Sequence, residues 1–221
     1  MSVSVDNFIK TIYLIKFDEK LKVSSTEMAR KLNISVAAVT DMAKKLSSRK
    51  ILLYKKYKEI ELTEKGRIDA IKIIRKHRLW ELFLNKVLGI PWDLVHKEAE
   101  MLEHQTSDKL ADRLEEYLDF PKFDPHGDPI PDKKENFPDK KNEINLYDSI
   151  ENKAYIVTRI ISNDAEIVRF FQHNSISIGK KIKIIQILRK NNSINIEVEK
   201  KSLLLNDNIA KNIFIKPSTE N

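Results

Sequence analysis

The sequence predicts a mainly α-helical protein with small β parts, and two observations lead to this class. Apolar residues recur at helical spacing through most of the first 120 residues. After residue 144 they give way to short β-branched runs at close spacing, which are typical of a small, partly open β-barrel. We therefore expect, in order along the chain, a winged helix-turn-helix domain over 1–74, a helical domain over 75–131, a linker over 132–145 and a small β domain over 146–217.

The composition is that of a globular protein of the cell interior. The chain has 221 residues, 41% hydrophobic and 33% charged, which is long enough for two small domains. It has no cysteine, so disulfide bonds and thiolate metal ligands are excluded. The N-terminus is charged, and no apolar run approaches the roughly 18 residues that cross a bilayer. We expect a soluble, cytoplasmic protein with no membrane partner.

The net charge of +7 is unevenly distributed along the chain. Residues 1–76 hold 18 Lys and Arg against 9 Asp and Glu, a balance of +9. Residues 77–131 hold 6 against 12, a balance of −6, and residues 132–221 hold 16 against 12, a balance of +4. A basic first third beside an acidic middle that contains four of the five histidines suggests a polyanion-binding unit joined to a cation-binding one.

The first 62 residues have the order of elements of a winged helix-turn-helix. Ser24 begins a capping box, and Ser35 is a second helix N-cap. Asn33, between the two short helices, tolerates the left-handed geometry of a tight turn. The expected elements are helices over 4–18, 26–32 and 36–50, then a basic hairpin, the wing, with strands over 51–54 and 59–62.

The rest of the chain is expected to hold two long helices and then the β domain. The first long helix runs from Thr63 to about 88, where Gly89-Ile90-Pro91 ends it. The second is expected as one continuous helix from 92 to roughly 117. The β domain is expected to have strands over 154–161, 181–188, 193–199, 202–205 and 213–215, with one short helix over 164–172.

The second helix of the helix-turn-helix would enter the major groove of DNA by its N-terminal end. There, alanine methyl groups can contact thymine, and lysines outside the groove bind phosphates without reading sequence. Three packed helices and a surface hairpin without function are the alternative. The candidate base-reading residues are Ser35, Ala37, Ala38, Thr40 and Asp41, and the candidate phosphate-binding residues are Lys44, Lys45, Lys55, Lys56 and Lys58.

Histidines and glutamates recur at helical spacing in the acidic middle of the chain. Residues three and four apart share a helix face, as in the pairs His77/Glu81, His96/Glu100 and Glu100/His104, with Glu103 three after Glu100. Imidazole and carboxylate without thiolate suit Mn, Fe, Zn, Co or Ni. A solvated face of Glu and His is the alternative interpretation, because short patterns produce false positives.

Longer stretches carry a more specific pattern than any one of these pairs. They are 75–81 (Arg-Lys-His-Arg-Leu-Trp-Glu), 95–104 with its spaced His, Glu, Glu and His, and 125–131 (Pro-His-Gly-Asp-Pro-Ile-Pro), with smaller matches at 39–42 and 62–66. With these residues, positions 4–131 resemble the family of the diphtheria toxin repressor and the manganese transport regulator. The C-terminal part is similar to the SH3-like domain of that family in outline.

The resemblance implies a metal-dependent transcriptional repressor of metal-ion homeostasis genes, a homodimer joined through the middle domain, and a pseudo-palindromic operator in double-stranded DNA. It implies one metal site at Glu100, Glu103 and His104 with a first-helix residue, which falls on Asn7, and a second at His77, Glu81 and His96. Some relatives also use the segment that matches Asp124 and His126 together with an acidic residue of the C-terminal domain, for which Asp164 is the nearest candidate.

The family implies Mn(II) or Fe(II) as the metal. Glu100 stands where manganese-responsive members have Glu and iron-responsive ones have Cys. An all-oxygen-and-nitrogen ligand set favours a hard cation, so Mn(II) is expected first and Fe(II) second, with Zn(II), Co(II) or Ni(II) as ions that could bind in vitro.

Two rival functions follow from the residues. A winged-helix regulator of an organic ligand would leave the His/Glu stripe as a salt-bridged surface. A carboxylate-bridged metalloenzyme in a helical bundle would need two Glu-x-x-His motifs. The sequence has none, and we therefore expect no enzyme.

Overall fold

The computed structural model describes residues 3–55, 58–139, 142–161 and 165–218. The chain forms two compact units. The first comprises the described residues of 1–84 together with 96–121 and 130–137, and the second comprises 85–95, 122–129 and the described residues from 138 onward. Among the described residues, no helix is both long and apolar enough to cross a membrane.

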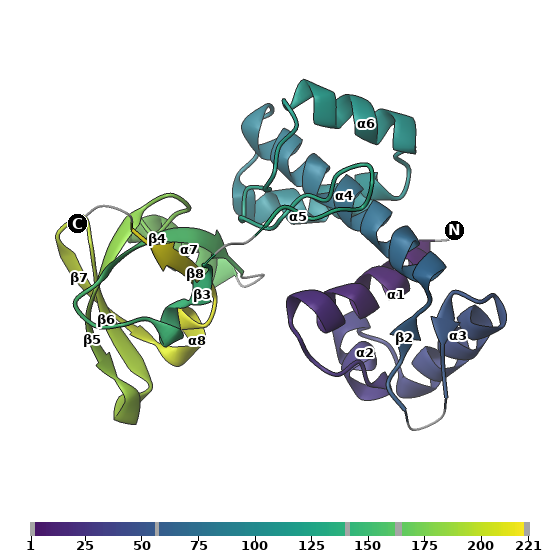
Figure 1. The fold of residues 1–221 in the computed structure, drawn as a ribbon, viewed down its shortest axis with the longest axis horizontal. Coiled ribbons are helices and arrows are strands. Elements are labelled where there is room, and N and C mark those ends of the chain that lie inside the picture. Colours follow the sequence, from purple (N-terminus) through teal and green to yellow (C-terminus); the bar gives the residue numbers. More distant parts are fainter. Residues whose placement is uncertain (1–2, 56–57, 140–141, 162–164, 219–221) are drawn as a thin grey trace. The chain divides into compact units, whose positions relative to one another are not determined.

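The first unit begins with the expected winged helix-turn-helix (Figure 1). Its elements are α1 (Val3–Tyr13), which continues into a π-helical turn (Leu14–Asp18), α2 (Ser25–Leu32), α3 (Val36–Ser48), β1 (Leu52–Leu53) and β2 (Glu61–Leu62). Ser24 accepts a hydrogen bond from the Glu27 amide and Ser35 one from the Ala38 amide, so both predicted N-caps are confirmed. Asn33 ends α2 in the left-handed conformation, with φ 52°. These local signals place α3 across α2.

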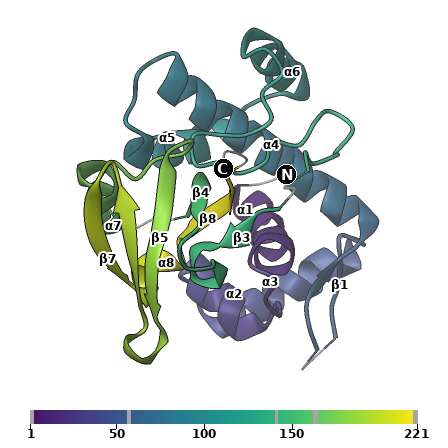
Figure 2. The ribbon, with the colours of Figure 1, turned by 60° about the vertical axis from the view of Figure 1, so that its left-hand side comes forward.

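One core holds the winged helix-turn-helix together. The apolar face of α1 (Val5, Phe8, Ile9 and Ile12) is buried with Val39, Ala43 and Leu46 of α3 and with the first half of α4. β1 and β2 pair antiparallel beside this core, with Leu52 opposite Leu62, and their hairpin extends away from the helices (Figure 2). Because α1 packs into this core, anything that moves α1 acts on the same core that positions α3.

The three helices of the middle segment are α4 (Glu64–Lys86), α5 (Trp92–Glu103) and α6 (Asp108–Tyr117). The prediction of one continuous helix over 92–117 was wrong, because the chain turns between α5 and α6. The Thr106 hydroxyl donates to the Leu102 carbonyl, and Ser107 caps α6 by accepting from the Leu110 amide. The Trp80 indole nitrogen donates to the same Thr106 hydroxyl at 2.7 Å and fixes the turn against α4.

The second unit is built on one six-stranded antiparallel sheet in the order β3-β8-β4-β5-β6-β7 (Figures 1 and 2). Its strands are β3 (Ile144–Asn145), β4 (Ala154–Ile160), β5 (Lys181–Leu188), β6 (Ser193–Val198), β7 (Lys201–Asn206) and β8 (Ile213–Pro217), with helices α7 (Ala165–His173) and α8 (Asp207–Ala210). The expected mainly helical fold with a small SH3-like β domain is confirmed. β3 and α8 were not predicted, because a two-residue strand and a one-turn helix leave no periodic pattern.

The segment 122–129 packs on this sheet through one glycine. Gly127 has φ +85°, and a Cβ built there would lie 2.1 Å from the Thr158 carbonyl oxygen, inside any allowed contact. At the end of the same strand, β4, the Ile160 amide donates to the His126 carbonyl at 2.9 Å. Only glycine therefore fits at 127 with the segment in this place.

Candidate metal centre and nucleic-acid interface

The six His and Glu residues expected as principal metal ligands come from two helices and the residue after them. α4 supplies two, α5 supplies three, and the last follows α5 directly; they are His77 and Glu81, then His96, Glu100 and Glu103, then His104. All six belong to the first compact unit. Ligand atoms of five of them form two groups, His77/His96/Glu100 and Glu100/Glu103/His104, each with atoms within 4.8 Å of one another. Glu81 is in neither group, although its Oε1 lies 3.0 Å from Nε2 of His77. The grouping differs from the expected pairing, because Glu100 belongs to both groups and Glu81 to neither.

Glu103 connects the two groups. Its side chain is fully buried, and one carboxylate oxygen, Oε2, lies 2.5 Å from Nδ1 of His77 on α4. The other oxygen, Oε1, accepts from the Lys10 ammonium of α1 at 2.7 Å. One carboxylate thus joins α1, α4 and α5, and a buried charge on it needs such neighbours to balance it.

His77 lies between the carboxylates of Glu81 and Glu103. Its Nε2 is 3.0 Å from Oε1 of Glu81 and 3.0 Å from Nδ1 of His96. Burial alone would lower the pKa of His77, but the charge of Glu81 and the hydrogen bonds with Glu103 and Glu81 outweigh it and raise the pKa to about 9. A cation is therefore favoured at this position, either as a proton on the ring or as an ion that replaces it.

The two ring nitrogens of His104 differ: one contacts a carboxylate, and the other has no hydrogen-bond partner among the described residues. Its Nδ1 lies 3.4 Å from Oδ2 of Asp6 on α1. Its Nε2 is buried without a hydrogen-bond partner, 3.4 Å from Oε1 of Glu103. The side-chain oxygen of Asn7 is likewise buried without a partner in the described part of the chain. Buried polar atoms are rarely left in this state, and an imidazole nitrogen and an amide oxygen are donor types that suit a metal ion.

Glu100 is the more accessible carboxylate, with its side chain 33% exposed. Burial raises its pKa, but the charge and hydrogen bond of Lys10, whose Nζ lies 2.6 Å from Oε2, outweigh that effect and lower the pKa. Glu100 is therefore ionised at neutral pH and offers an oxygen ligand at the outer side of the cluster.

The structure does not group the remaining candidates for metal binding with these six. Asp124 and His126 belong to the second compact unit, where Oδ1 of Asp124 accepts from the amides of His126 and Asp128 at 2.8 and 2.9 Å and shapes the turn. The His126 ring packs 5.0 Å from the Trp92 ring. Asp164 lies outside the described residues.

Two residues of α1 escaped the sequence analysis. Asp6 and Lys10 are buried, 8% and 7% exposed, although charged residues are almost never fully buried without partners. The signal was present in the sequence, because the two residues are four apart and therefore share one face of the helix. Spacing along one helix could not show that this face meets α5, some 90 residues away.

The candidate DNA-binding residues divide by exposure as the helix-turn-helix requires. Val39, Ala43 and Leu46 face the core, while the opposite face of α3 and the described ends of the hairpin are open to solvent. The exposed candidates are Ser35, Ala37, Ala38, Asp41, Lys44, Lys45, Lys55 and Lys58, and Thr40 is partly exposed. The Ser35 hydroxyl oxygen also serves as an N-cap acceptor. Lys56 lies outside the described residues.

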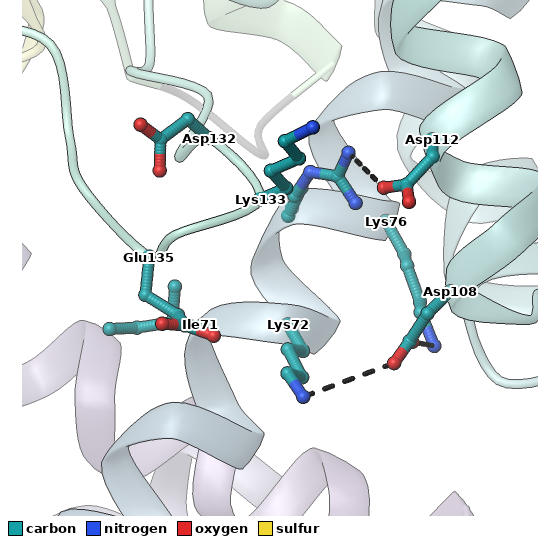
Figure 3. A pocket seen from close by; sticks show the side chains of 9 residues that line it. Ile71, Lys72, Lys76, Asp108, Asp112, Asp132, Lys133 and Glu135 are labelled. Carbon is teal, nitrogen blue, oxygen red and sulfur yellow. Dashed lines mark hydrogen bonds and ion pairs between the residues drawn. The ribbon is translucent and has the colours of Figure 1, made fainter.

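A pocket on the first unit, between α4, α6 and residues 132–135, is a separate feature (Figure 3). Its lining mixes both charges without histidine. Lys76 lies 2.8 Å and Lys72 3.9 Å from Asp108, and Arg75 lies 2.7 Å from Asp112. Asp108 and Asp112 are thus matched by ammonium and guanidinium groups and have little charge left for a metal ion. Among the described residues no group of His and carboxylate ligand atoms that could hold an ion lies in this pocket, so it is not a candidate metal centre.

A basic winged helix-turn-helix joined to a buried histidine–carboxylate cluster defines the class of protein, a metal-responsive DNA-binding regulator. Three family models match the chain. They are the N-terminal DNA-binding domain of iron-dependent repressors (residues 1–60), their metal-binding and dimerisation domain (63–132) and the FeoA domain (144–217).

Curated relatives agree with these matches. An HTH-type transcriptional regulator of Methanocaldococcus jannaschii is 39% identical over 119 residues, which are 54% of this chain and 95% of that protein. The iron-dependent repressor IdeR of Mycobacterium tuberculosis is 35% identical over 128 residues, 58% of this chain and 55% of IdeR. The diphtheria toxin repressor of Corynebacterium jeikeium is 29% identical over 184 residues, 82% of this chain and 75% of that protein.

Solved structures extend the likeness to nearly the whole chain. A manganese-dependent transcriptional repressor in complex with manganese has a TM-score of 0.90 and 28% identity over 97% of this chain and 100% of that one. The regulator ScaR with bound Zn²⁺ has a TM-score of 0.82 and 31% identity over 97% and 99% of the two chains.

The chain belongs to the iron-dependent repressor family, which includes the diphtheria toxin repressor. The resemblance drawn from the sequence is confirmed. The protein is a metal-dependent DNA-binding repressor, not an enzyme.

Proposed function

We propose that Mn(II), or as the second choice Fe(II), activates this repressor by binding at the cluster formed by α1, α4, α5 and His104. The observation that carries the proposal is the pair of buried atoms without hydrogen-bond partners among the described residues, Nε2 of His104 and Oδ1 of Asn7. Asn7 belongs to α1, and His104 directly follows α5, the helix that carries Glu100 and Glu103. Oxygen and nitrogen donors without sulfur favour a hard or borderline cation.

The ligands would form two sites. Asn7, Glu100, Glu103 and His104 would hold one ion, and His77, Glu81 and His96 would hold a second. Glu100 faces both groups, so it would serve either ion. The family structures in which ScaR holds Zn²⁺ or Cd²⁺ support the expectation that other divalent ions, Zn(II), Co(II) and Ni(II) among them, bind this donor set in vitro.

DNA binding would use the exposed face of α3 and the wing. The methyl groups of Ala37 and Ala38 would contact thymine, and Thr40 and Asp41 would reach neighbouring base edges. Lys44 and the hairpin lysines would bind phosphates, which give affinity and salt dependence rather than sequence preference.

A homodimer would present two such faces to a pseudo-palindromic operator. The family model describes residues 63–132 as the metal-binding and dimerisation domain. In that segment an apolar cluster leaves aromatic side chains at the surface, with the Phe83 ring 5.7 Å from Trp80 and 5.8 Å from Tyr117. Tyr117 is 67% and Phe120 64% exposed, and we propose that a second copy covers this face.

The link between metal and DNA would be α1. Its apolar face belongs to the core that positions α3, and its polar residues Lys10 and Asp6 contact Glu100 and Glu103 of α5 and His104, respectively. An ion held between α1 and α5 would favour one placement of the DNA-binding elements. It could shift that equilibrium only by its difference in affinity between the two placements.

A metal-by-metal DNA-binding series tests this function. The operator would first be selected from a random duplex pool in the presence of Mn(II). Operator affinity would then be measured with Mn(II), Fe(II), Zn(II), Co(II) and Ni(II) for the wild type, Glu103→Gln and His104→Gln. We expect Mn(II) or Fe(II) to tighten binding of the wild type and to have no effect on either variant.

His173→Ala is the matched control, because His173 is an exposed histidine on α7. It should respond to metal as the wild type does. An unchanged metal response in both Glu103→Gln and His104→Gln, with both variants folded, would refute the site. An operator affinity that depends on an organic ligand instead of an ion would favour the other class of winged-helix regulator.

A further inference from the structure

The Lys10 ammonium occupies the space between the two carboxylates of α5 that the proposed metal site requires. Its Nζ donates to Oε2 of Glu100 at 2.6 Å and to Oε1 of Glu103 at 2.7 Å. Only 9% of the Lys10 side chain is exposed and none of the Glu103 side chain. This is a buried, charge-assisted bridge rather than a surface ion pair, which would contribute little.

We propose that Lys10 is a built-in competitor of the metal ion: it neutralises Glu100 and Glu103 when metal is absent and must leave them when metal binds. The proposal rests on the proposed function, since it concerns the same ligands. It adds that this chain supplies its own cation to the site and so sets the metal concentration at which the site fills.

The charges of the cluster explain why the chain needs such a cation. Glu103 is fully buried, and Asp6, which faces His104, is also buried. Carboxylates brought together out of water without a positive partner repel one another and lose their hydration. Lys10 compensates two of them and, because it belongs to α1, fastens α1 to α5 in the absence of metal.

The same bridge opposes a divalent ion. If Lys10 stays, an ion that approaches the two carboxylates meets a like charge a few ångströms away. If Lys10 leaves, two charge-assisted hydrogen bonds are broken. In either case the affinity for metal is lower than the ligands alone would give, and loss of such hydrogen bonds is worth about a ten- to hundredfold change in an equilibrium constant.

Calorimetric titration with Mn(II) tests this competition. Lys10→Met keeps the aliphatic length and removes the charge, Lys10→Gln keeps a donor group, and Lys10→Arg keeps the charge. We expect Lys10→Met and Lys10→Gln to bind Mn(II) about ten- to hundredfold more tightly than the wild type. Lys10→Arg should stay near the wild type. Equal or weaker binding by whichever of Lys10→Met and Lys10→Gln is folded would overturn the proposal.

Lysine acetylation followed by mass spectrometry tests the displacement in the unaltered protein. Lys10 should be protected in chelator and become reactive with saturating Mn(II). Lys16, on the turn after α1, has a 42% exposed side chain and should react in both conditions. Continued protection of Lys10 in the saturated protein would overturn the displacement.

Glu103→Gln separates this proposal from the function on which it rests. If the wild type binds Mn(II), Glu103→Gln does not, and Lys10→Met matches the wild type, then the metal site stands and the competition is wrong. If neither the wild type nor any Lys10 variant binds a divalent ion, the metal site itself is wrong, and the competition fails with it.

Discussion

Oδ2 of Asp6 lies 3.4 Å from Nδ1 of His104 and leaves Nε2 as the nitrogen of that ring for the proposed metal ion. A carboxylate that accepts the Nδ1 proton fixes the tautomer in which the lone pair is on Nε2. Nε2 is the buried nitrogen that has no hydrogen-bond partner in the described part of the chain. Asp6 therefore positions a proposed ligand without being one.

Asp6→Asn tests this positioning role. The amide removes the negative charge and can present its NH₂ group to Nδ1, so we expect Mn(II) affinity to fall by about 10- to 100-fold. The measurement is calorimetric titration of the folded variant. Asp18→Asn is the control, because Asp18 forms an ion pair with Arg78, at 2.8 Å, and not with a proposed metal ligand. Equal loss in both variants would mean that any missing charge near α1 has this effect.

Lys44→Ala tests the phosphate role on α3. Loss of one phosphate contact should weaken binding to the operator and to random DNA by a similar factor. It should also reduce the slope of log affinity against log salt by about one. Fluorescence anisotropy at four salt concentrations measures both, with Lys109→Ala on α6 as the exposed control. A loss confined to the operator would show that Lys44 contacts bases instead.

Gly127→Ala should detach the segment 122–129 from the sheet. Its Cβ would lie 2.1 Å from the Thr158 carbonyl oxygen at φ +85°, and we expect a loss of about 1–3 kcal/mol or more in the unfolding of the second unit. Gly179→Ala is a matched control, because Gly179 has φ +84° with open space around it. The difference between the two variants isolates the steric contact from the backbone strain.

Fluorescence of Trp92 reports this transition. The chain has two tryptophans, so a Trp80→Phe background leaves Trp92, which packs against His126, as the single reporter. Equal urea midpoints for the two glycine variants would contradict the close approach.

Alkaline pH should destabilise the first unit through Tyr13. Burial, with a smaller contribution from Asp18, raises the pKa of Tyr13 from 10.0 to about 12. The unfolded chain then ionises first, so the contribution to stability is complete below pH 10 and is lost as the pH rises toward 12. At pH 11 the loss is on the order of 1 kcal/mol.

Tyr13→Phe has no proton to lose at this position. We therefore expect that, between pH 9 and 11, the free energy of unfolding by urea rises for this variant relative to that of the wild type. A constant difference between the two proteins over this range would show that Tyr13 ionises equally in the folded and unfolded chains.

Local signals in the sequence were sufficient for most of the fold. Ser24, Ser35 and Asn33 mark helix ends through contacts with their own neighbours, and each marks the end observed. The break between α5 and α6 was missed because His104, Asp108 and Ala111 continue a helical spacing across it. The turn depends instead on Trp80, a residue of another helix that donates to Thr106.

The candidate site shows the same division. Spacing along single helices, with the family resemblance, selected the five His and Glu residues that the structure groups together and Glu81, which contacts two of them. It could not select Asp6 and Lys10, because their importance lies in contacts across 98 and 93 positions of the chain. Those contacts exist only after α1 has packed.

The two oxygens of Glu103 also determine which substitutions can separate the two proposed metal sites. One oxygen faces His77, while the other faces Lys10 and His104, so any change at this carboxylate disturbs both halves at once. In the proposed ligand sets Glu81 serves one ion and Asn7 the other, so the effect of a substitution at either residue can be assigned to a single site.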